Sequence, residues 1–125
     1  MEVWRIEDVE GFGMYYNLWW KTADTQNDQW HPTPYESHGL LNQARNKEHI
    51  RGGLVEPYHF GFSGKRQFLQ WVYDPEWRKN MHLFGAKLKV YKVDKRYCCI
   101  DDHQVMFVKE KATLVREMDI DIFDR

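Results

Sequence analysis

The chain has 125 residues, of which 42% are hydrophobic and 30% are charged, and its formal net charge is −1. This length suits a single domain, and the balance of charge excludes both a disordered chain and a strongly basic nucleic-acid binder. No apolar run reaches the roughly 18 residues of a membrane-spanning helix, and the acidic N-terminus is unlike a signal peptide, so we expect a cytoplasmic protein with no membrane contact.

The first predicted element is a strand over Val3–Ile6, which would place Trp4 and Ile6 on one face and Arg5 on the other. The glycines at 11 and 13 predict a turn after it. Residues 14–20 are apolar on both faces and fit either a buried strand or a short helix. A long polar loop over 21–34 and a weak helix over 35–50 follow.

The central segment predicts a strand within 54–63, followed by a helix from about residue 65 to 73. A second helix should begin at Asp74-Pro75-Glu76, which supplies an N-cap, a proline at the first helical position and an acid in the first turn. Gly85 should end that helix. Its core-facing stripe is expected to consist of Trp77, Met81 and Phe84.

The last third is rich in strands, predicted at 88–93, 97–100, 104–109 and 112–118, with a further strand over 119–123. The adjacent Cys98 and Cys99 cannot easily bridge each other, so we expect buried free thiols. The order of elements predicts one α+β domain over residues 1–125. Its sheet should be single, twisted and mostly antiparallel or mixed, with two or three short helices.

Four polar residues are candidates for a binding site. Arg5 either faces solvent or uses its planar fork to bind a carboxylate or phosphate. Ser63 lies between a strand and a helix, where it is either the helix N-cap or part of a pocket floor. His59 and His103 are the two best acid–base candidates, although each is more often structural than catalytic in such positions.

Gln104 begins a predicted strand after the turn residues Asp101 and Asp102, and its amide can position a hydroxyl or a water but cannot act as a general base. The six histidines lack i, i+4 metal spacing, and no cysteine–histidine pattern suggests zinc, so the sequence predicts no metal site.

Several of these residues together resemble a divergent ADP-ribosyltransferase core. The similar features are Trp4-Arg5 on the first strand, Phe60-x-Phe62-Ser63 running into a helix with Gln67 and Trp71, and a later strand that begins Asp102-His103-Gln104. The resemblance implies that Arg5 holds NAD, Ser63 supports the nicotinamide ribose and Gln104 occupies the catalytic position. A glutamate stands there in active transferases, so the resemblance leaves catalysis open, and His103 or His59 would have to handle the proton.

Most of the chain also resembles short proteins encoded by tailed bacteriophages. The shared features are Trp4-Arg5-Ile6-Glu7, the turn at 11–15, Gly61-Phe62-Ser63 running into a Trp-bearing helix, and a terminal Gln-Val-x-Phe strand at 104–107. This resemblance implies a protein that acts in the cytoplasm of an infected bacterium.

Two functions of different classes follow. In the first, a cleft near Arg5, Tyr15, His59, Ser63 and Gln104 binds a nucleotide-like ligand such as NAD. In the second, a phage-encoded binding protein inhibits a host or defence-system protein through an aromatic surface, with hot spots of the kind that Trp and Tyr commonly form. The candidate hot spots are Trp19, Trp20, Trp30 and Tyr35. A homodimer on the same surface is a third alternative.

Overall fold

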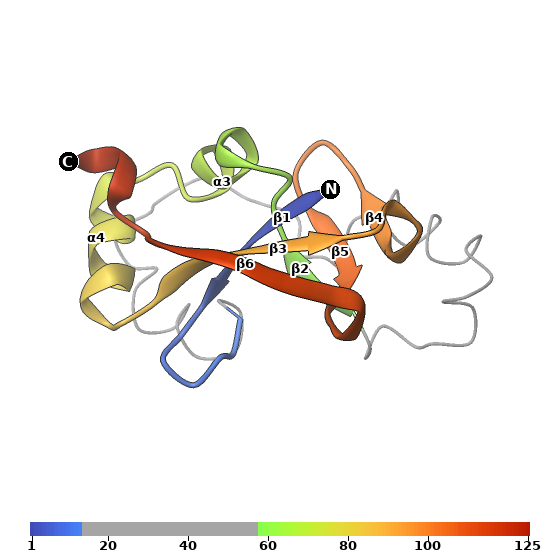
Figure 1. Cartoon of the computed structure of the whole chain (residues 1–125). Helices are drawn as coiled ribbons and strands as arrows, with labels where there is room; N and C mark the ends of the chain where they lie inside the picture. Colours follow the sequence, from blue (N-terminus) through green and yellow to red (C-terminus); the bar gives the residue numbers. More distant parts are fainter. Residues whose placement is uncertain (14–57) are drawn as a thin grey trace.

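The structure is a computed structural model that describes residues 1–13 and 58–125 (Figure 1). Within these residues the strands are β1 (Glu2–Glu7), β2 (Tyr58–Gly61), β3 (Lys87–Val93), β4 (Cys98–Ile100), β5 (Val105–Val108) and β6 (Ala112–Asp119). The helices are α3 (Lys65–Trp71) and α4 (Pro75–Leu83), and the 3-10 turns are η4 (Lys95–Tyr97), η5 (Lys109–Lys111) and η6 (Ile122–Asp124). The α+β class is therefore confirmed.

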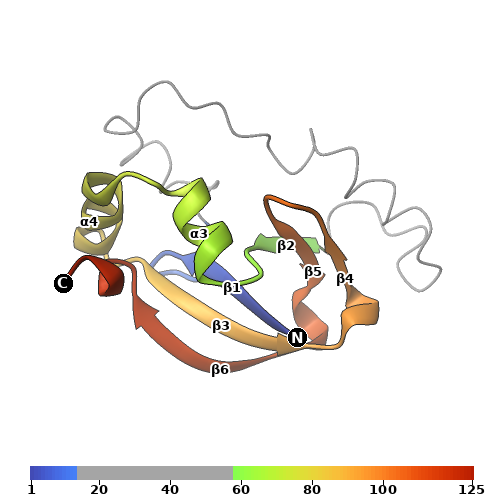
Figure 2. The ribbon, with the colours of Figure 1, turned by 90° about the horizontal axis from the view of Figure 1, so that it is seen from above.

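The described strands form two antiparallel sheets and not the single sheet predicted. One sheet has the order β1-β3-β6 and the other β2-β5-β4. They meet where the backbone of Trp4 in β1 pairs with that of Phe62, just beyond β2, through N–H···O bonds of 2.7 and 2.6 Å. We refer to the β1-β3-β6 sheet, which has the longer strands, as the larger sheet. Seen from above in Figure 2, α3 and α4 lie along one side of it. β1 thus belongs to the β1-β3-β6 sheet and borders the other sheet.

Gly61 permits this junction because it has no side chain. A Cβ atom at that position would lie 2.5 Å from the carbonyl oxygen of Trp4 and 2.8 Å from Cγ1 of Val3. The backbone of β1 therefore occupies the space beside Gly61. In the sequence this glycine suggests a place where a ligand could approach the backbone, and in the structure a neighbouring strand takes that place.

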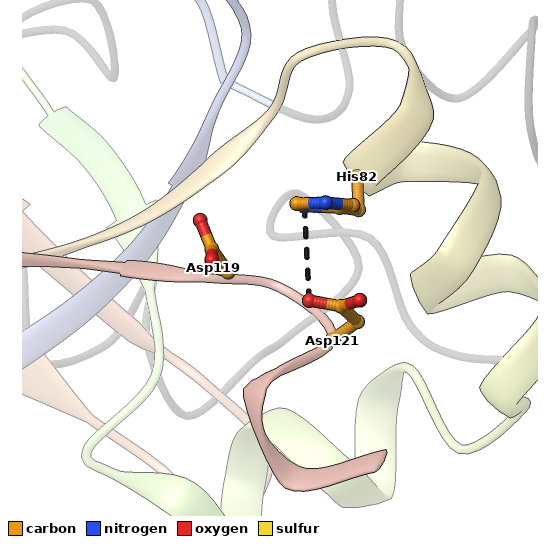
Figure 3. Close-up of side chains that lie close together, drawn as sticks. All are labelled: His82, Asp119 and Asp121. Atoms are coloured by element: carbon orange, nitrogen blue, oxygen red, sulfur yellow. Dashed lines mark ion pairs between the residues drawn. The ribbon is translucent and has the colours of Figure 1, made fainter. Parts of the chain in front are cut away.

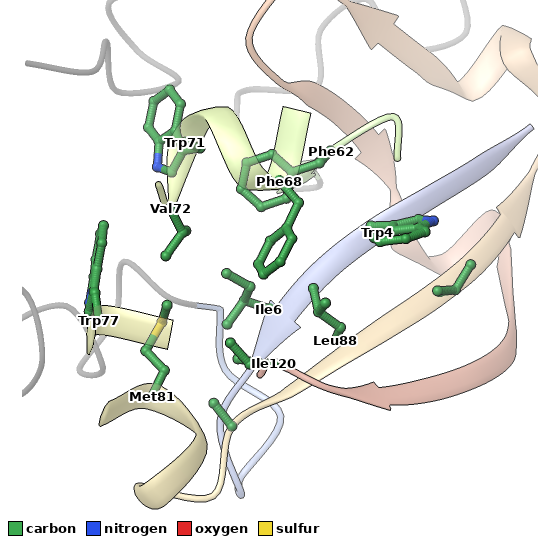
Figure 4. Close-up of a cluster of buried hydrophobic side chains, with 12 residues drawn as sticks. Trp4, Ile6, Phe62, Phe68, Trp71, Val72, Trp77, Met81, Leu88 and Ile120 are labelled. Atoms are coloured by element: carbon green, nitrogen blue, oxygen red, sulfur yellow. The ribbon is translucent and has the colours of Figure 1, made fainter. Parts of the chain in front are cut away.

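Trp4 and Ile6 share one face of β1, as predicted, and the alternation of this strand divides the core in two. Trp4 and Ile6 face α3 and α4 in the larger cluster, which Figure 4 shows. The other buried members of this cluster are Phe62, Phe68, Trp71, Val72, Trp77, Met81, Ala86, Leu88, Val90 and Ile120. Val3 faces the second sheet and packs with Tyr91, Val93, Cys98, Val105 and Phe107. Both cysteines are buried free thiols, as expected.

The N-terminus of α4 is capped by a side chain, whereas that of α3 is not. The Asp74 carboxylate accepts the backbone N–H of Glu76 at 2.9 Å, which confirms the predicted N-cap of α4. The N-cap of α3 is Gly64 and not Ser63, and no side chain caps that helix. No helix in the described part of the chain is long and apolar enough to cross a membrane.

Two predictions near helix ends were wrong. Phe84 is 51% exposed and not part of the core stripe, because α4 ends at Leu83 and Phe84 leaves the helical register. The further strand expected over 119–123 is absent: β6 ends at Asp119, and a turn and η6 follow it. There the ring of Phe123 stacks on Trp4, with centroids 6.0 Å apart and planes 9° apart. This packing across the fold outweighs the local strand preference.

Candidate functional site

The structure brings Ser63 and the turn before Gln104 together through one side chain, Gln67. The Gln67 amide oxygen accepts the backbone N–H of Ser63 at 2.9 Å, and its nitrogen donates to the carbonyl of Asp101 at 2.8 Å. The Asp101 carboxylate in turn accepts the backbone N–H of Gln104 at 2.8 Å. Ser63 is exposed, whereas Gln104 is only 1% exposed. Gln67 therefore acts as a brace between the end of β2 and the β4–β5 turn.

Arg5 touches the second sheet but its guanidinium already has partners. Nη1 donates to the carbonyl of Phe60 at 3.1 Å, and Nε donates to the Glu7 carboxylate at 3.1 Å. Arg5 lies on the same face of β1 as Glu7 and is buried with it. Its guanidinium therefore binds a carboxylate through Nε, in line with one of the two alternatives that the sequence left open, and that carboxylate belongs to the chain itself.

The remaining predicted residues are scattered. His103 is exposed in the β4–β5 turn, where its backbone N–H donates to the Asp101 carboxylate at 2.8 Å. His59 is half-buried in β2 and its ring lies 6.3 Å from that of Phe107. Tyr15 and the candidate hot spots Trp19, Trp20, Trp30 and Tyr35 lie outside the described residues. No single cleft is therefore defined by the predicted set within the described part of the chain.

Glu7, which the sequence did not single out, is the centre of a buried ionic cluster. Its carboxylate lies 3.1 Å from Arg5 Nε, 3.3 Å from Lys89 Nζ and 3.4 Å from Lys109 Nζ, and it accepts a 2.5 Å hydrogen bond from the Tyr91 hydroxyl. These groups come from β1, β3 and η5. The cluster fixes where η5 lies against the larger sheet.

The ionisation of this cluster follows from its partners. Burial acts to raise the pKa of Glu7, but the Tyr91 hydrogen bond and the charges of Lys109, Arg5 and Lys89 outweigh it, so that the pKa is lowered. Burial and the bond to Glu7 raise the pKa of Tyr91 well above its usual range. Glu7 is thus an anion that the protein's own cations neutralise, which indicates a structural role.

An exposed apolar surface is the second feature that the sequence did not reveal. It begins in the turn after β1, where Val9 is 76% exposed and Phe12 is also exposed. Asp8 holds this turn rigid: its carboxylate accepts the backbone N–H groups of Glu10 and Phe12, both at 2.9 Å. Gly11 takes a positive φ of 88° within it.

The turn after α4 carries the other half of this surface. Leu83 is 71% exposed and is followed by the exposed Phe84. Gly85, with φ 86°, ends the helix as predicted, and its N–H donates to the carbonyl of His82 at 2.9 Å. The N–H of Ala86 donates to the carbonyl of Met81 at 3.1 Å, which completes a Schellman motif.

The two turns lie side by side, because a Cβ atom on Gly85 would come within 2.5 Å of Cγ1 of Val9. We refer to Val9, Phe12, Leu83 and Phe84 together as the apolar turn pair. Each half is held by backbone hydrogen bonds, so these large side chains are displayed from a rigid base.

The fold and its surface define a small α+β domain built on two antiparallel sheets. The family model of the bacteriophage T4 Y00F protein matches residues 1–121, and the chain belongs to this family. It is also 38% identical over 66 residues to a protein of Enterobacteria phage T4 described as the "Uncharacterized 19.7 kDa protein in motB-dexA intergenic region". That alignment covers 53% of this chain and 39% of the T4 protein. No solved structure matches the chain.

Proposed function

We propose that this phage protein works by binding a protein of the infected bacterium through the apolar turn pair, and that it thereby inhibits a host or defence-system protein. The observation that carries the proposal is the exposure of Val9 and Leu83, 76% and 71%, on two adjoining turns. Large apolar side chains that gather on a surface commonly mark sites where another protein binds.

The rigidity of both turns supports this function. A side chain presented from a preorganised backbone loses little freedom on binding, so more of its buried area contributes to affinity. The exposed aromatic rings of Phe12 and Phe84 are of the residue types that dominate interface energetics. The aromatic hot spots expected from the sequence at 19–35 are a separate prediction and remain untested.

The charges of the first turn favour one kind of partner. Asp8 and Glu10 flank Val9, and Glu10 is exposed. A partner that seats Val9 and Leu83 in an apolar groove would therefore gain from basic side chains at the rim of that groove. A second copy of this chain is the less favoured occupant, because it would bring two further carboxylates to the same rim.

Transferase-like binding of NAD has less support in the geometry. The guanidinium that would hold a phosphate is bound to Glu7 and to the carbonyl of Phe60. Gln104, the residue in the catalytic position of the resemblance, is almost fully buried. The ADP-ribosyltransferase-like core stays a prediction, and titration of the protein with NAD and with ADP-ribose by calorimetry tests it.

The test of the proposed surface compares two leucines that are both exposed but lie on different elements. Leu83→Glu places a charge in the apolar turn pair, and Leu114→Glu places the same charge on β6. A partner captured from host lysate would be purified, and its Kd for each variant measured by calorimetry. Removing a leucine anchor costs about 1.5 kcal/mol or more, so Leu83→Glu should weaken binding at least about tenfold.

Wild-type protein and Leu114→Glu should bind this partner equally well. Equal affinities for all three proteins, or the absence of any stoichiometric partner, would overturn the proposal. Sedimentation at several concentrations addresses the homodimer: a dimer that Leu83→Glu disrupts would replace the host protein with a second copy as the occupant.

A further inference from the structure

Three side chains that can ligate a metal converge at the end of the larger sheet (Figure 3). His82 comes from the last turn of α4, Asp119 is the final residue of β6, and Asp121 lies in the turn before η6. One ligand atom from each residue lies within 4.8 Å of the others. The sequence did not predict this group, because spacing rules find ligands that are close in sequence and here two distant elements supply them.

The orientation of the His82 ring adds a second observation. Its Nδ1 atom is buried and makes no hydrogen bond within the described part of the chain. This nitrogen lies 3.7 Å from a carboxylate oxygen of Asp121, and Figure 3 shows the ring next to that carboxylate. Two atoms bound to one tetrahedral zinc ion at bonds of about 2.1 Å are about 3.4 Å apart, so this pair is already near a chelating separation.

The carboxylates of this group are neutralised by two cations of the chain. Asp119 accepts hydrogen bonds of 2.5 Å from Lys87 and from Arg125, and Arg125 also reaches Asp121 at 3.2 Å. Arg125 is exposed, so it can withdraw without disturbing the core.

We propose that His82, Asp119 and Asp121 bind one divalent metal ion of the zinc type, which takes the place of Arg125 as the counter-charge. Imidazole nitrogen together with carboxylate oxygen suits Zn²⁺ and its neighbours in the first transition row, whereas Mg²⁺ and Ca²⁺ prefer oxygen alone. Three protein ligands leave a fourth position for water. The ion would tie the end of α4 to the end of β6.

Calorimetric titration of the full chain with Zn²⁺ at about pH 7 tests this site, since the histidine must be neutral to ligate. His82→Gln removes one ligand and should weaken binding at least about tenfold, because even indirect support of a ligand is worth that much. Arg125→Ala removes the competing cation and should bind Zn²⁺ more tightly. His103→Gln changes an exposed histidine elsewhere and should bind as the wild type does.

A second readout follows the coordination directly. Co²⁺ in place of Zn²⁺ should give an intense visible absorption typical of tetrahedral sites in the wild type and in Arg125→Ala, and lose it in His82→Gln. Circular dichroism of each variant confirms that the fold is kept. No heat with wild-type protein, equal affinity in His82→Gln, or weaker binding in Arg125→Ala would each overturn the proposal.

Discussion

Replacing Glu7 by glutamine tests whether the buried ionic cluster stabilises the fold. The carboxylate is 1% exposed and its nearest cation, Arg5, is 8% exposed. Glutamine keeps the size of the side chain but removes its charge, which leaves Arg5 buried without a counter-ion. Breaking a buried ion pair in this way costs about 3–5 kcal/mol. Since the whole domain should be stable by only about 5–15 kcal/mol, the loss is large.

The matched control changes Glu117, an exposed glutamate that pairs with Lys89, which also contacts Glu7. Glu117 lies 3.6 Å from Lys89 Nζ, and its side chain is 49% exposed. Glu117→Gln should cost less than about 1 kcal/mol, because solvent screens the pair. Urea unfolding at neutral pH gives both free energies, and an unchanged m-value would show that the denatured state is the same.

The loss of stability in Glu7→Gln should depend on pH in a direction that the pKa of Glu7 determines. The pKa of Glu7 in the folded protein lies below its usual value of 4.5. The stability that its charge contributes is therefore present above pH 4.5 and is lost as the pH falls through the folded pKa. The difference between wild type and Glu7→Gln should be constant near neutrality and shrink in acid. A cost no greater than that of Glu117→Gln, or a gap that widens in acid, would refute the reasoning.

Two further matched pairs probe the junction of the sheets and the end of the chain. Gly61→Ala should lower the free energy of unfolding by about 2–3 kcal/mol, because its Cβ would meet the backbone of β1. Gly64→Ala is the control and should cost little, because a Cβ there has no atom within 4 Å. Urea unfolding compares the two variants. Arg78→Ala should cost about 3 kcal/mol, because this buried side chain bonds the Val72 carbonyl at 2.5 Å and Asp124 at 2.7 and 2.9 Å. Arg116→Ala is the control, because it removes a similar pair of hydrogen bonds to the exposed Glu2 and should cost less. A loss of melting temperature comparable to that of Arg78→Ala would show that burial does not decide the effect.

Local sequence signals were sufficient to predict the ends of α4 and the alternation of side chains along β1. Asp74-Pro75-Glu76 and Gly85 predicted both ends of α4, and the alternation of β1 predicted that Trp4 and Ile6 share one face. These features depend on neighbours within a few residues. They could be predicted because capping and strand alternation act at that range.

The separation into two sheets depends on contacts between distant segments. Nothing near Gly61 in sequence indicates that the backbone of Trp4 passes within 2.5 Å of where its Cβ would be. The candidate surfaces escaped prediction for the same reason. Val9 and Leu83 look like ordinary exposed or core residues until the two turns are brought together, and Glu7 looks like a solvated strand residue until Lys109 and Tyr91 surround it.

The pairing of β1 with β3 affects how the chain folds during synthesis. The amino group of Met1 donates to the carbonyl of Val93, 92 positions later in the sequence. At bacterial rates of about 5–20 residues per second, β1 leaves the ribosome roughly 5–20 s before its partner strand exists. In that interval Val3, Trp4 and Ile6 have no sheet to join and are available to chaperones. β3 pairs with β6 across the intervening β4 and β5, so the three strands of this sheet can assemble only after β6 has been synthesised.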